Sequence, residues 1–91
     1  VVIVGCSHPG ILNILGTVRQ RFSQPIRAVV GGTHLVEADR ERIHKTIRTM
    51  KALGIGLLGF NHCSGELLRS MMAENPELNT VYLGAGDCLF L

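Results

Sequence analysis

Residues 1–10 read VVIVGCSHPG, a run of four β-branched residues that ends in a loop of small and polar ones. Such a run favours a strand, and because its two faces are both apolar we expect both to be covered. From about Pro9 to Phe22, apolar residues then recur at helical spacing, and proline suits a first helical turn. The stretch therefore predicts a strand, a loop that contains His8, and a helix.

The same strand–loop–helix unit recurs twice further along the chain. Strand Ile26–Gly31 precedes a helix at about Asp39–Leu53, for which Asp39 is the expected N-cap and Gly54 the expected stop. Strand Ile55–Phe60 precedes a third helix, which begins after Gly65. This alternation predicts an α/β fold with three helices and a mostly parallel sheet.

The chain closes with two further predicted strands, Thr80–Leu83 and Asp87–Leu91, joined through the short Gly-rich segment 84–86. Strands joined by so short a turn usually pair antiparallel. We therefore expect a mixed sheet.

The composition is that of a globular protein, with 46% hydrophobic and 18% charged residues and a net charge of +2 over 91 residues. Most basic residues stand singly on predicted helices and are interpreted as solvated faces. Nucleic-acid binding is disfavoured because there is no Trp and only one Tyr. No apolar run approaches the ~20 residues of a membrane span. Three scattered cysteines, Cys6, Cys63 and Cys88, make no disulfide framework, so we expect a cytoplasmic setting.

Three of the four histidines, His8, His34 and His62, each follow the carboxyl end of a predicted strand. In an open α/β sheet these ends meet at one edge, so we expect the three imidazoles to converge there. Imidazole binds zinc, manganese or iron, and three protein ligands with one open position are typical of catalytic zinc. His44 lies on the polar side of the second helix and is interpreted as a surface residue.

Small polar residues and two thiols flank these histidines. The polar residues are Ser7, Thr33, Asn61 and Ser64. Either they orient the imidazoles by hydrogen bonds or they are ordinary loop and capping residues. Cys6 and Cys63 are interpreted as small buried residues, not as ligands.

The motifs VGCSHPGI (4–11), GGTHL (31–35) and HCSG (62–65) resemble, in that order, the downstream half of a metallo-β-lactamase-superfamily branch. That branch comprises metal-dependent hydrolases, among them dihydropterin ribofuranosyl-aminobenzene-phosphate synthases. The resemblance implies the C-terminal half of an αββα sandwich over residues 1–91. It also implies that His8 and His62 are the first and last downstream metal ligands. His34 stands where many members have a bridging aspartate.

The upstream His-x-His-x-Asp-His motif of the superfamily is absent from this chain. The resemblance therefore implies a fragment, inactive alone, of a hydrolase that acts on a small molecule at a mono- or dinuclear centre. Zinc is the expected metal, with manganese or iron as alternatives. The bare sheet face is expected to pack against the N-terminal half or a second copy.

Two other readings stay open. One is a doubly wound nucleotide- or phosphate-binding module without catalysis, with anions held at the helix starts after Gly10 and Gly65. The other is a purely structural or interaction domain.

Overall fold

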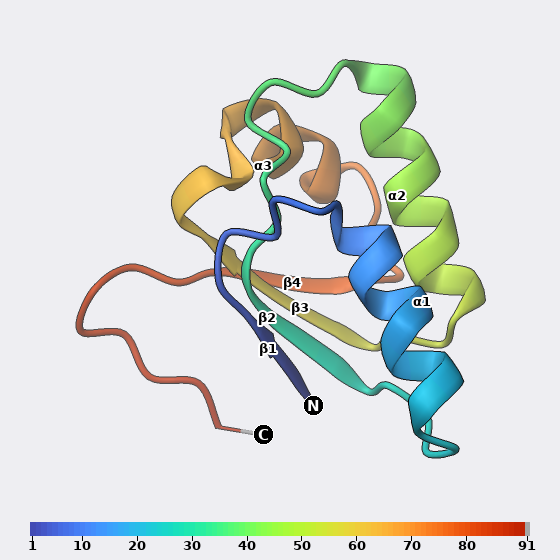
Figure 1. The fold of residues 1–91 in the computed structure, drawn as a ribbon. Coiled ribbons are helices and arrows are strands. Elements are labelled where there is room, and N and C mark those ends of the chain that lie inside the picture. The colour runs from blue at the N-terminus through green and yellow to red at the C-terminus, as the bar shows by residue number, and fades with distance from the viewer. Residues whose placement is uncertain (91) are drawn as a thin grey trace.

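The computed structural model describes residues 1–90, apart from the side chain of His62. Its sheet has four strands: β1 (Val2–Val4), β2 (Ala28–Gly32), β3 (Leu57–Asn61) and β4 (Asn79–Tyr82). Between them lie three α-helices and one 3₁₀ turn: α1 (Ile11–Arg21), α2 (Arg40–Ala52), η1 (His62–Ser64) and α3 (Glu66–Ala73). The strands lie in sequence order and every neighbouring pair is parallel, as Figure 1 shows. The predicted α/β fold with three helices is confirmed.

The expectation of a mixed sheet is wrong. β4 pairs parallel with β3, and residues 87–90 form no strand, while Leu91 lies outside the described residues. The local reason is a tight turn in which Gly84 N–H donates to Asp87 Oδ2 at 2.7 Å and Asp87 N–H to Gly84 O at 3.1 Å. This turn sends the C-terminal segment away from the edge of the sheet (Figure 1).

The two predicted ends of α2 are confirmed. The Asp39 side chain accepts a hydrogen bond from Arg42 N–H at 2.9 Å, which caps the first turn. After the last turn, Gly54 adopts φ 76°, a conformation that glycine adopts without steric cost. α1 begins two residues later than Pro9, because Gly10 has φ 98° and lies outside the helix.

All three helices cover the same face of the sheet (Figure 1). Their buried side chains form one cluster with those of the central strands, which includes Leu15, Ile47, Met50, Leu58 and Leu68. A doubly wound arrangement, with helices on both faces, is therefore excluded for the described residues. None of these helices has the length and apolar character of a membrane span.

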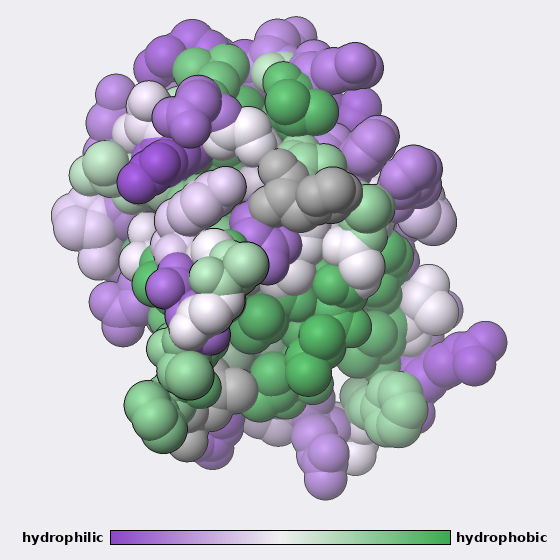
Figure 2. Space-filling view, turned by 90° about the vertical axis from the view of Figure 1, so that its left-hand side faces the viewer, coloured by the Kyte–Doolittle hydropathy of each residue, from purple (hydrophilic) through white to green (hydrophobic). Residues whose placement is uncertain are grey.

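The opposite face of the sheet carries an apolar row that no helix covers. In register across the four strands, this row consists of Ile3, Val30, Gly59 and Val81. Ile3 is 80% exposed. The C-terminal segment reaches the row at Gly59, where a Cβ would lie 2.8 Å from Leu83 and 3.4 Å from Leu89. Figure 2 shows apolar side chains gathered on this side of the molecule.

Candidate metal centre

The loop after β1 is held tightly against the end of β2. Gly31, with φ 135°, lets the strands approach so closely that a Cβ there would lie 2.0 Å from Val4 O. One residue on, Gly32 N–H donates to Gly5 O at 2.8 Å, and the buried Ser7 hydroxyl donates to Gly32 O at 2.6 Å. These bonds fix the backbone from which His8 projects.

The structure brings His8 and His34 together at the carboxyl edge of the sheet. Their rings are stacked, with centroids 4.4 Å apart and planes at 24°. Both side chains are exposed. His34 has φ 55° and its N–H donates to Cys63 Sγ at 3.2 Å, so its backbone is fixed by the loop after β3.

The third predicted ligand, His62, is placed by its backbone alone, because its side chain lies outside the described residues. It opens η1 directly after Asn61, the last residue of β3, and Asn61 pairs in register with Gly32. The His62 backbone therefore reaches the same edge as the loops of His8 and His34. Among the described side chains, no group of three or more His, Cys, Asp or Glu is close enough to hold a metal ion.

Ser64 is the centre of the hydrogen bonds beneath the histidine pair. It is fully buried, and its hydroxyl donates to Asn61 O at 2.8 Å. The same oxygen accepts from Thr33 N–H at 3.2 Å and from the buried Thr33 hydroxyl at 2.9 Å. The hydroxyls of Ser7, Thr33 and Ser64 thus connect the loops that follow β1, β2 and β3. None of these hydrogen bonds ends on an imidazole.

We expect Ser64→Ala to lower the free energy of unfolding by about 1–3 kcal/mol, because buried partners would lose their hydrogen bonds where water cannot replace them. Urea denaturation of parent and variant measures the loss. Ser70→Ala, on the exposed side of α3, is the matched control and should change stability by less than about 0.5 kcal/mol. Equal effects of the two substitutions would contradict the role given to Ser64.

The thiols of Cys6 and Cys63 lie at the same edge and are half-exposed, so the expectation that both are buried is wrong. Cys63 Sγ lies 3.4 Å from Cys6 O, within hydrogen-bond reach. Desolvation by its surroundings, and then the neighbouring Cys63 thiol, raise the pKa of the Cys6 thiol above its ordinary value. Cys6 is therefore a neutral thiol at pH 7.

His44, the fourth histidine, lies on α2 away from this edge and is exposed, as the sequence predicts.

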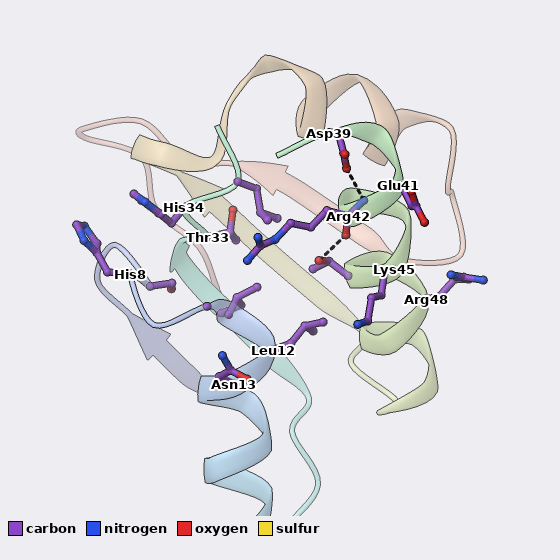
Figure 3. Close-up of a pocket in the computed structure, with 15 residues that line it drawn as sticks. His8, Leu12, Asn13, Thr33, His34, Asp39, Glu41, Arg42, Lys45 and Arg48 are labelled. Atoms are coloured by element: carbon purple, nitrogen blue, oxygen red, sulfur yellow. Dashed lines mark hydrogen bonds between the residues drawn. The ribbon is translucent and has the colours of Figure 1, made fainter. Parts of the chain in front are cut away.

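A cavity of about 530 Å³ opens beside the histidine pair, between the start of α1 and α2. His8 and His34 border one end, where Figure 3 shows their rings directed outward, and Arg42 and Lys45 of α2 line the opposite side. Both cations are exposed, as the sequence predicts for a solvated helix face, and that face borders the cavity. Their spacing of three residues places both on one face of α2, but it does not predict which residues lie opposite that face.

Comparison with solved structures first shows which class of protein the chain resembles. Over 88% of its length the chain superimposes with a TM-score of 0.80, at 34% identity, on a metal-dependent hydrolase of the β-lactamase superfamily, of which it covers 31%. The resemblance to the metallo-β-lactamase superfamily, in its metal-dependent hydrolase branch, is thereby confirmed.

Among curated proteins, the chain is similar to a 7,8-dihydropterin-6-methyl-4-(β-D-ribofuranosyl)-aminobenzene-5'-phosphate synthase from Methanocaldococcus jannaschii. The identity is 36% over 90 residues, which is 98% of this chain. The chain spans 31% of the length of that relative. No family model matches the sequence.

Proposed function

We propose that this chain contributes histidine ligands, His8, His34 and His62, to the metal site of a hydrolase related to the metallo-β-lactamases. The single observation that carries the proposal is the stacking of His8 on His34 at 4.4 Å. One strand–helix unit separates them in sequence, yet they meet at the edge where α/β sheets bind ligands. Both imidazoles are exposed and stack on each other, so packing in the core does not explain their position.

The donor set fits a divalent metal such as zinc, with manganese or iron as alternatives. Ring nitrogens bind zinc at ~2 Å, so two rings with centroids 4.4 Å apart can share one ion after small rotations of their side chains. A metal bound there would supply a hydroxide at neutral pH and polarise the bond under attack. The chain's own contribution is to hold the two imidazoles on loops fixed by Ser7 and Cys63.

The described residues hold too few donors for a complete site. Since the chain covers 31% of its relatives, we propose that the other ligands come from the remaining part of a larger protein. That part would pack on the uncovered face of the sheet and form a domain with residues 1–91. The substrate would be a small molecule, and the three free cysteines suit the reducing cytoplasm.

A metal titration tests the proposal. The 91-residue chain alone should bind zinc weakly and hydrolyse little or no bis(p-nitrophenyl) phosphate, whereas the complete protein should bind zinc tightly and turn it over. Competition with a chromophoric chelator measures affinity. Robust hydrolysis by the isolated chain would sink the proposal of an incomplete site. A complete protein that binds no metal would favour the alternative, a phosphate-binding module without catalysis.

A further inference from the structure

The cavity beside the histidine pair presents two cations that meet no carboxylate. Arg42 extends across it toward Thr33, and Lys45 enters it from the next turn of α2 (Figure 3). Within residues 1–90 neither forms an ion pair. Arg40 and Lys51, at the two ends of the same helix, do so, at 3.7 Å from Glu74 and 3.0 Å from Glu77.

Two acidic residues also line the cavity, and neither forms an ion pair with Arg42 or Lys45. Asp39 uses Oδ1 to cap α2, where it accepts from Arg42 N–H at 2.9 Å. Glu41 points away from the cavity, and so does the third cation of the lining, Arg48 (Figure 3). The cavity therefore presents two exposed cations that have no ion-pair partner among residues 1–90, which favours an anionic ligand.

We propose that this cavity binds a phosphomonoester group of the substrate through Arg42 and Lys45. A phosphomonoester carries close to two negative charges at neutral pH, which matches two cations, whereas a carboxylate carries one. The planar guanidinium of Arg42 matches two phosphate oxygens and the ammonium of Lys45 acts as a point charge. The start of α1 adds weaker support, since Gly10 gives no side-chain cap and the first turn has no acid.

The inference rests on the proposed function in one respect: the molecule held by its phosphate presents its reacting group to His8 and His34. The histidines line the other end of the same cavity, so one small molecule can span both. Binding energy from a phosphate remote from the reacting bond would orient the substrate. Arg42 and Lys45 are thus binding residues that select phosphorylated substrates.

Calorimetry on the complete protein, freed of metal with EDTA, tests the inference. The probes are phenyl phosphate and benzoate, which share a ring and differ in the anion. The parent should prefer phenyl phosphate, and Arg42→Gln and Lys45→Gln should each weaken its binding roughly tenfold or more. Arg40→Gln removes the same charge from the same helix outside the cavity, and should change the affinity less than twofold.

Three outcomes would overturn the inference: no binding of phenyl phosphate by the parent, equal affinity for benzoate, or an equal loss in the Arg40 and Arg42 variants. Because the assay contains no metal, its result is independent of the metal titration. Arg42→Gln should weaken phenyl phosphate binding and leave the zinc affinity unchanged, because Arg42 is not a proposed metal ligand. A failure of the metal proposal and a failure of the phosphate pocket are therefore distinguishable.

Discussion

Replacing His8 by alanine in the complete protein should abolish its metal-dependent activity. Changes to residues that only orient a metal ligand cost 10- to 100-fold in affinity or activity, so loss of a ligand should cost more than ~100-fold. His8 is exposed in a loop whose position depends on Ser7 and Gly32, so the substitution should leave the fold intact. Activity, bound zinc and the thermal midpoint are the three measurements, and only the first two should fall.

His44→Ala is the matched control, because it removes an exposed imidazole from α2. Its activity should stay within a few-fold of the parent. His62→Ala should match His8→Ala. If His44→Ala were as damaging as His8→Ala, the assignment of the metal centre to the carboxyl edge of the sheet would be wrong.

The second large effect concerns the uncovered face of the sheet. Soluble monomers rarely expose contiguous apolar patches beyond a few hundred Å². The isolated 91-residue chain should therefore self-associate and bind an apolar dye, and Ile3→Lys should reduce both effects several-fold. Sedimentation velocity and dye fluorescence measure them. Addition of the N-terminal part as a separate piece should abolish dye binding.

Val36→Lys serves as the control, since Val36 is 55% exposed on the loop before α2 and lies outside the uncovered row. It should leave self-association unchanged. An isolated parent chain that stays monomeric and binds no dye would show that the C-terminal segment covers this face sufficiently. The sheet-to-sheet partner would then be unnecessary.

Periodicity alone predicts most of this fold, because each strand–helix unit is encoded locally. Asp39 and Gly54 mark the ends of α2 for the same reason, and the carboxyl-edge rule correctly predicts that His8 and His34 meet. The predicted antiparallel fifth strand does not form. The Asp87 carboxylate accepts a hydrogen bond from Gly84 N–H, and this bond closes a turn in place of a hairpin. The approach of Arg42 to Thr33 depends on where α2 lies on the sheet, and no local sequence pattern contains that information.

Ser7 and His34 share a left-handed backbone, with φ 58° and 55°, in a chain whose other positive-φ residues in the described part are all glycine. This conformation costs a residue with a Cβ roughly 1 kcal/mol or more relative to glycine. At Ser7 the buried hydrogen bond from its hydroxyl to Gly32 O offsets this cost, whereas the exposed His34 side chain has no such bond. A variant with Gly at 34 should therefore melt later and lose the imidazole. A screen that selects for stability alone should therefore remove the imidazole that this loop displays at position 34.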